Sequence, residues 1–157
     1  MEKSPFSKLD HIGVVVRDFD RAVKHYESLG IGPFLAVEGL SSIERRMYGK
    51  VIPIDSFKLK EKNARMGSVM LQLMQPVEGE TIWKEFLDKR GEGIQHLGFL
   101  VDDIDKEEAR MVAKGYTVLY RSRFKGGGGS NYFDTGKVGG VLIELIQWPP
   151  NLKWLPK

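Results

Sequence analysis

Residues 9–31 read LDHIGVVVRDFDRAVKHYESLGI, and residues 94–116 repeat this pattern as IQHLGFLVDDIDKEEARMVAKGY. Six of the 23 aligned positions are identical, among them His11 with His96. Chance alone would give roughly one or two identities at ordinary residue frequencies. The constant spacing of 85 residues therefore indicates an internal repeat, which predicts two related structural units in one chain.

A second, shorter repeat lies further along each unit. Residues 69–75, VMLQLMQ, match residues 141–147, VLIELIQ, at a spacing of 72 residues, so that Gln72 corresponds to Glu144; Pro76 follows the first segment and Trp148-Pro149 the second. The shorter spacing means that the first unit carries about 13 additional residues, which we place within 32–60. We expect a first module at 6–77, a linking helix within 78–92, a second module at 93–148 and a tail at 149–157.

Each module is expected to open with a strand and to continue into a helix. Residues 9–16 carry apolar side chains at both parities, which is typical of a strand that is buried on both faces. Asp18 is a candidate N-cap for the helix, and Gly30 suits the position that follows its last turn. Three strands follow, at 117–121, 130–133 and 140–146 in the second module. A βαβββ unit that occurs twice predicts an α+β fold.

Four polar side chains interrupt apolar strands at positions related by the repeats, and they are His11, Gln72, His96 and Glu144. Side chains alternate between the faces of a strand, so each shares a face with apolar neighbours, where a polar group without a partner is costly to bury. All four converge on one point if a pseudo-twofold axis relates the modules. Two imidazoles, an amide oxygen and a carboxylate suit one divalent metal ion, such as zinc, cobalt, nickel, manganese or iron.

A single histidine on an apolar strand is more often a hydrogen-bonded core residue than a metal ligand, so the set of four favours the metal hypothesis. Gly13 and Gly98 are expected to leave space beside the two histidines, which suits an ion with open positions for substrate. The third histidine, His25, has no counterpart in the second module and is expected on a helix surface.

Composition excludes several classes of protein. The 157 residues contain no cysteine, which excludes a disulfide scaffold, a thiolate zinc site and a cysteine nucleophile. The net charge of +3 is a weak basic bias, too small to indicate nucleic-acid binding. No leader-like segment and no apolar run of membrane-spanning length are visible, so we expect a cytoplasmic protein that does not bind membranes.

Several cations are candidates for contact with an anionic substrate, and they are Arg121, Arg123, Lys125 and Lys58. Arg45, Arg46 and Lys50, in the stretch with additional residues, allow the same interpretation. For both groups the alternative is a solvated strand face. The glycine run 126–129 lies between two expected strands and lacks the sequence of a phosphate loop, which favours a turn or a lid.

Two βαβββ modules with polar residues on the first and last strand of each resemble the vicinal oxygen chelate superfamily. This superfamily contains glyoxalase I, extradiol dioxygenases, bleomycin-resistance proteins and the methylmalonyl-CoA epimerases. The chain is most similar to the epimerases, at residues 9–13 (LDHIG), 86–96 (FLDKRGEGIQH), 101–105 (VDDID) and 139–147 (GGVLIELIQ). The resemblance implies a curved mixed sheet that forms a cup around one divalent metal per chain, a homodimer, and the ligands His11, Gln72, His96 and Glu144.

The first module departs from the epimerase pattern. Such epimerases carry a second acid on the third strand of this module, facing the α-carbon of the substrate. The corresponding strand is expected at 56–60, SFKLK, which contains no acid, while Glu44 and Glu61 lie nearby without an assigned place. The stretch 39–55 is also longer than the resemblance predicts.

The leading functional hypothesis is a metal-dependent epimerase that removes and returns a proton α to a thioester carbonyl, with Glu144 as a catalytic base. The implied substrate is an anionic acyl-CoA or another thiol conjugate. A glyoxalase I-type lyase is the first alternative. An iron-dependent dioxygenase would use a triad of two histidines and a carboxylate, and Gln72 as a fourth ligand argues against it. A non-enzymatic binding protein is the last alternative, and an intact ligand set disfavours it.

Overall fold

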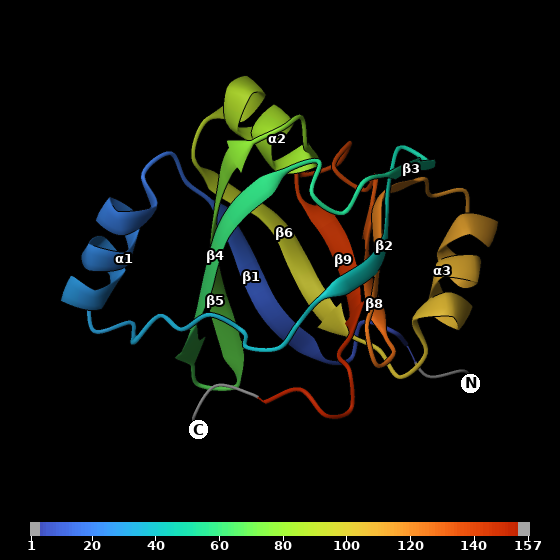
Figure 1. Ribbon diagram of the computed structural model, residues 1–157, viewed down its shortest axis with the longest axis horizontal. Helices are drawn as coiled ribbons and strands as arrows, with labels where there is room; N and C mark the ends of the chain where they lie inside the picture. Colours follow the sequence, from blue (N-terminus) through green and yellow to red (C-terminus); the bar gives the residue numbers. More distant parts are fainter. Residues whose placement is uncertain (1–3, 154–157) are drawn as a thin grey trace.

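The two sequence repeats form one curved sheet with helices around it, as the computed structural model shows for residues 4–153 (Figure 1). The strands are β1 (Leu9–Val15), β2 (Ser42–Met47), β3 (Lys50–Ile52), β4 (Lys58–Met66), β5 (Val69–Glu78), β6 (Gly93–Leu100), β7 (Val118–Phe124), β8 (Gly129–Phe133) and β9 (Leu142–Gln147). The helices are α1 (Phe19–Ser28), α2 (Ile82–Arg90) and α3 (Ile104–Ala113). The strand order across the sheet is β3-β2-β7-β8-β9-β6-β1-β5-β4.

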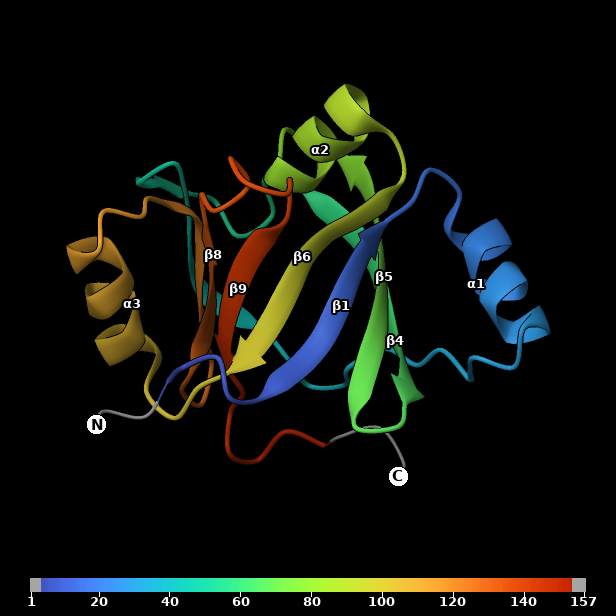
Figure 2. The same cartoon turned by 180° about the vertical axis from the view of Figure 1, so that it is seen from behind.

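The first strands of the two repeats lie side by side at the centre of the sheet. β1 and β6 pair in antiparallel fashion, β5 lies parallel to β1, and β9 lies parallel to β6 (Figure 2). Both parallel pairs therefore bring the first and last strand of one repeat together. The sheet is mixed and strongly curved, which confirms the predicted α+β class and the cup-shaped sheet.

Helices α1 and α3 cover the outer face of the cup at its two sides, and α2 lies at one end (Figures 1 and 2). The side chain of Asp18 accepts a hydrogen bond from the backbone of Arg21 and caps α1, as predicted. Alternate side chains of a strand point to opposite faces of the sheet, so the sheet has one apolar layer on each face. On β5, for example, Leu71 and Leu73 pack in the cluster beneath α1, whereas Met74 belongs to the cluster that α2 covers.

The additional residues of the first module form a hairpin that crosses to the other module. Strands β2 and β3 lie within this stretch, so the first half of the chain contains one strand more than the predicted βαβββ unit. β2 pairs with β7 of the second half, and β3 forms the edge of the sheet. The hairpin thereby extends one wall of the cup.

The predicted tail folds back on the same chain. Just before the tail, the ring of Trp148 stacks on Phe124, and within the tail Lys153 forms an isolated antiparallel bridge with Glu38. The last tail residues, 154–157, lie outside the described residues. Among residues 4–153, no helix is long and apolar enough to cross a membrane.

Candidate metal centre

Two rows of paired residues cross the centre of the sheet and bring polar side chains to its concave face. One row runs over β5, β1 and β6 and contains Gln72, Gly13 and His96. The other runs over β1, β6 and β9 and contains His11, Gly98 and Glu144. Partners on neighbouring strands project to the same face, so the register itself gathers the four side chains of the proposed ligand set.

The polar atoms of these side chains form a compact buried group. Nε2 of His11 lies 2.7 Å from Oε2 of Glu144 and 3.3 Å from Nε2 of His96. The same nitrogen of His96 lies 3.3 Å from Oε2 of Glu144 and 3.1 Å from Oε1 of Gln72. One ligand atom from each histidine and from Glu144 falls within 4.8 Å of the others. Two imidazole nitrogens that face one carboxylate at this spacing fit a single divalent ion.

Each histidine is held from behind by the residue that precedes it in the chain. Nδ1 of His11 lies 2.8 Å from Oδ2 of Asp10, and Nδ1 of His96 lies 3.0 Å from Oε1 of Gln95. The amide of Gln95 in turn donates to the backbone oxygen of Ile82 in α2. Such partners fix the tautomer that leaves Nε2 free to bind a metal. Asp10 and Gln95 were not among the predicted site residues, although the spacing of 85 residues that relates the histidines also relates this pair.

Two glycines make room for the rings, but not in the way that the sequence suggested. A Cβ atom on Gly13 would lie 1.9 Å from Cε1 of His96, and one on Gly98 would lie 2.2 Å from Cε1 of His11. Each glycine therefore accommodates the imidazole from the opposite module, so the expected open space beside each histidine is filled by a ring.

Replacement of Gly98 by alanine is expected to lower the free energy of unfolding by about 1–3 kcal/mol, because the added methyl group overpacks the His11 ring. Urea denaturation of the metal-free protein measures this loss. Gly136→Ala is the control, because the nearest atom to its Cβ would be the end of the Leu142 side chain at 3.3 Å, and its other neighbours lie 3.8 Å or more away. Equal stability of the two variants would contradict the close packing of glycine against imidazole.

The buried charges act in opposite directions on the two histidines. Burial lowers the pKa of His11, but the charge of Glu144 and hydrogen bonds to Asp10 and Glu144 outweigh it and raise this pKa to about 10. Burial and the charge on His11 hold the pKa of His96 well below its usual value. In the metal-free protein, protonated His11 therefore stabilises the fold below pH 6.5, and this contribution is lost as the pH rises to about 10.

A metal ion must displace the proton of His11, because only neutral imidazole is a ligand. We expect the release of about one proton per ion at pH 7.5 and an affinity that rises about tenfold per pH unit until the pH approaches 10. Calorimetric titration with zinc in buffers of different ionisation enthalpy measures the released proton. Asp10→Asn is expected to reduce the release, whereas binding without proton release in the unaltered protein would contradict this charge state.

A second carboxylate, which sequence analysis left without a place, faces the same cavity. β4 runs to Met66, well beyond the strand expected at 56–60, so that Glu61 lies inside it. Oε1 of Glu61 accepts a hydrogen bond of 3.0 Å from Nε2 of Gln72. Both residues line a cavity of about 120 Å³ together with Glu144. Burial and then the charge of Glu144 raise the pKa of Glu61, against the opposing influence of His11 and Asn63.

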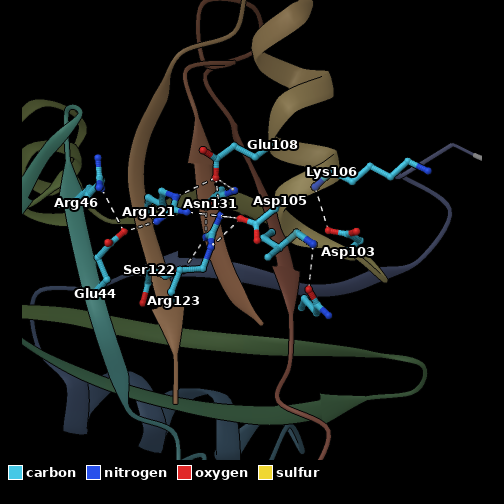
Figure 3. A network of polar contacts seen from close by, with 12 residues as sticks. Glu44, Arg46, Asp103, Asp105, Lys106, Glu108, Arg121, Ser122, Arg123 and Asn131 are labelled. Atoms are coloured by element: carbon cyan, nitrogen blue, oxygen red, sulfur yellow. Dashed lines mark hydrogen bonds and ion pairs between the residues drawn. The ribbon is translucent and has the colours of Figure 1, made fainter. Parts of the chain in front are cut away.

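The structure does not bring the candidate cations Arg121 and Arg123 to this cavity. Both lie on the face of β7 towards α3, where they share the carboxylate of Glu108 (Figure 3). Arg123 also donates to Oδ1 of Asn131 at 2.9 Å. The alternate residues of β7, such as Ser122, line the cavity instead. This saturated network holds α3 against the sheet.

The other two cations of the predicted substrate site also lie away from the described lining of the cavity. Nζ of Lys58 pairs with Oε1 of Glu78 at 2.9 Å on an exposed part of the β4–β5 hairpin. Lys125 is exposed in the turn between β7 and β8, which also contains residues 126–128 of the glycine run, while Gly129 begins β8. His25 is exposed on α1, as expected.

Comparisons with known proteins agree with this architecture. The model of the glyoxalase/bleomycin resistance protein/dioxygenase superfamily matches residues 10–133. Methylmalonyl-CoA epimerase from Mycobacterium tuberculosis is 30% identical, with 96% of this chain and 93% of that chain covered and a TM-score of 0.70. A Streptomyces coelicolor methylmalonyl-CoA epimerase in complex with 2-nitronate-propionyl-CoA is 24% identical over 90% of this chain and 97% of that chain, with a TM-score of 0.64, a likeness of fold. An uncharacterized protein of Bacillus subtilis (strain 168), YqjC, is 24% identical, with 90% of this chain and 92% of that protein covered.

Proposed function

Because this chain belongs to the glyoxalase/bleomycin resistance protein/dioxygenase superfamily, we propose that it is a metal-dependent epimerase of a 2-carboxyacyl thioester such as methylmalonyl-CoA. The observation that carries the proposal is the pair of carboxylates, Glu61 on β4 and Glu144 on β9, that line one cavity together with Gln72, while Glu144 also contacts both histidines. Strands β6, β1 and β5 separate the two carboxylates in the sheet, which is curved, and both carboxylates line the cavity.

The proposed ligands of one divalent ion are His11, Gln72, His96 and Glu144. When bound, this ion would polarise the thioester carbonyl and favour the enolate over the neutral thioester. A thioester α-proton is weakly acidic, so its removal requires both this stabilisation and a base within hydrogen-bond reach. The residues around the cavity supply the base.

Epimerisation requires proton removal from one face of the α-carbon and proton return on the other. In the metal-free protein, burial and then the charge of Glu144 raise the pKa of Glu61, which favours its protonated form. We therefore assign Glu61 and Glu144 as the two proton-transfer groups. For one epimer, Glu61 would take the α-proton while Glu144 delivers a proton to the opposite face through an oxygen that is not bound to the ion, and the roles reverse for the other epimer.

The test is hydrogen exchange in D₂O. Zinc- or cobalt-loaded protein is incubated with methylmalonyl-CoA, and incorporation of one deuterium at the α-carbon is followed by mass spectrometry. Enzyme-dependent exchange that disappears when chelator removes the metal supports the proposal. Retention of hydrogen under both metals, with a substrate shown to bind, would refute it.

A glyoxalase-type lyase remains the second candidate, because a hemithioacetal could use the same two carboxylates and the same ligand set. The hemithioacetal of methylglyoxal and glutathione therefore belongs in the same assay, with S-lactoylglutathione as the product. Iron-dependent oxygen uptake would instead favour a dioxygenase. Binding of a small molecule without turnover would favour a non-enzymatic binding protein. Light scattering in solution tests the expected homodimer.

A further inference from the structure

The β2–β3 hairpin places one arginine in the wall of the cavity. On β2, Arg45 pairs in register with Ser122 of β7, which also lines the cavity. The neighbouring Arg46 points to the outer face, where its Nε pairs with Glu44 at 3.2 Å (Figure 3). Two adjacent arginines of the same insertion thus have opposite environments, and only the first is a lining residue.

The guanidinium of Arg45 is held in place, but it is not saturated. Its Cζ lies 4.6 Å from the centroid of the Phe57 ring, and Nη1 donates to the backbone oxygen of Ile54. The Nε atom is buried and has no hydrogen-bond partner among the described residues. A buried N–H that lacks a partner is costly, and a charged guanidinium makes strong, directional hydrogen bonds with carboxylates.

The charges of the residues that line the cavity indicate which kind of ligand group Arg45 could bind. Among its described lining residues, Arg45 is the one lysine or arginine, whereas Glu61 and Glu144 are both acidic. Within residues 4–153, Arg45 forms no ion pair with either of these carboxylates, so its guanidinium is available to a ligand. The volume of about 120 Å³ accommodates a small acyl group, and a thiol carrier must extend through the opening.

We propose that Arg45 is a specificity-determining residue that binds the free carboxylate borne on the acyl group of the substrate. This inference rests on the proposed function and adds that the pocket selects 2-carboxyacyl thioesters over neutral acyl thioesters. Arg45 would orient the acyl group so that its α-carbon faces Glu61, while the proton transfer itself belongs to the two carboxyl groups.

Four measurements on Arg45→Met test the assignment, with Arg46→Met as the matched control on the opposite face. For methylmalonyl-CoA, Arg45→Met is expected to raise KM for α-hydrogen exchange about 10- to 100-fold, the loss of one charged hydrogen bond, with a much smaller change in kcat. For the methyl ester of the same thioester, both variants are expected to match the unaltered protein. Inhibition by free CoA is also expected to be unchanged. Arg45→Lys keeps the charge but not the planar fork. Its KM for methylmalonyl-CoA is expected to lie between those of the unaltered protein and Arg45→Met.

The fourth measurement does not depend on turnover. Binding of malonate to the zinc-loaded protein is measured by calorimetry, and Arg45→Met is expected to weaken it at least about tenfold. If the unaltered protein exchanges no α-hydrogen but binds malonate in an Arg45-dependent manner, the epimerase proposal fails and the carboxylate site stands.

Three results would overturn the assignment. Equal losses for the acid and its methyl ester would make Arg45 a structural residue of the hairpin. If Arg45→Met also weakens inhibition by free CoA, Arg45 would instead contact a phosphate of the thiol carrier. Malonate binding that is absent, or equal in Arg45→Met and the unaltered protein, would show that the arginine does not recognise a carboxylate.

Discussion

Replacement of Glu61 by glutamine is expected to lower the rate of α-hydrogen exchange by about 10²–10⁴-fold, the usual contribution of a general base. Glutamine keeps the shape of glutamate, and its side-chain oxygen can still accept the hydrogen bond from Nε2 of Gln72. The variant should therefore retain its fold and its metal. The measurement is deuterium incorporation into methylmalonyl-CoA, with metal content determined on the same sample.

Glu44→Gln is the matched control for this prediction. Sequence analysis left both acids without an assigned place, but Glu44 lies on the outer side of β2, in ion pairs with Arg46 and Arg121. Its replacement is expected to leave the exchange rate within about twofold, the scale of a surface substitution. Slow exchange in Glu44→Gln together with normal exchange in Glu61→Gln would show that the assignment of Glu61 as the second base is wrong.

Removal of a central imidazole is expected to abolish metal binding. His96→Ala deletes the nitrogen that lies within 3.3 Å of both His11 and Glu144. Loss of a residue that hydrogen-bonds to a metal ligand reduces metal affinity by about 10–100-fold. Loss of the ligand itself should therefore reduce the affinity by at least about 100-fold. Elemental analysis of protein purified without chelator should show about one divalent ion per chain in the unaltered protein and nearly none in the variant.

His25→Ala controls for the loss of a histidine as such. This residue is exposed on α1, away from the cavity lining, and its replacement should leave the metal content unchanged. Far-ultraviolet circular dichroism of His96→Ala separates loss of metal from loss of fold. A variant that is folded and retains a full complement of metal would exclude His96 from the site.

The sequence was most informative where repeat and strand parity agreed. Equivalent positions in two strands of known parity predict side chains on one face, and the register indeed brings His11, Gln72, His96 and Glu144 together. The α+β class followed from the repeated βαβββ unit, whereas the curved mixed sheet was an implication of the family resemblance. Assignment of the four residues to a metal is still a prediction, which the experiments above test.

The insertion is where prediction from sequence failed. The strand expected at 56–60 ends just before Glu61, because no repeat signal marks where β4 begins or ends after a stretch without a counterpart. The same stretch left the orientation of Arg45 open. On β7, both faces are covered, so apolar periodicity cannot tell whether Arg121 or its neighbour Tyr120 faces the cavity. Tertiary packing decides such cases.

The separation of the central residues along the chain has a mechanical consequence. His11 and Glu144 lie 133 residues apart in sequence, yet Nε2 and Oε2 of these residues are 2.7 Å apart. An ion shared by the two would act as a reversible cross-link that closes almost the entire chain into a loop. Closure of so long a loop restricts the unfolded chain strongly, as a disulfide does. In a chain without cysteine, resistance to heat and to pulling on the two termini would then rise and fall with the concentration of free metal.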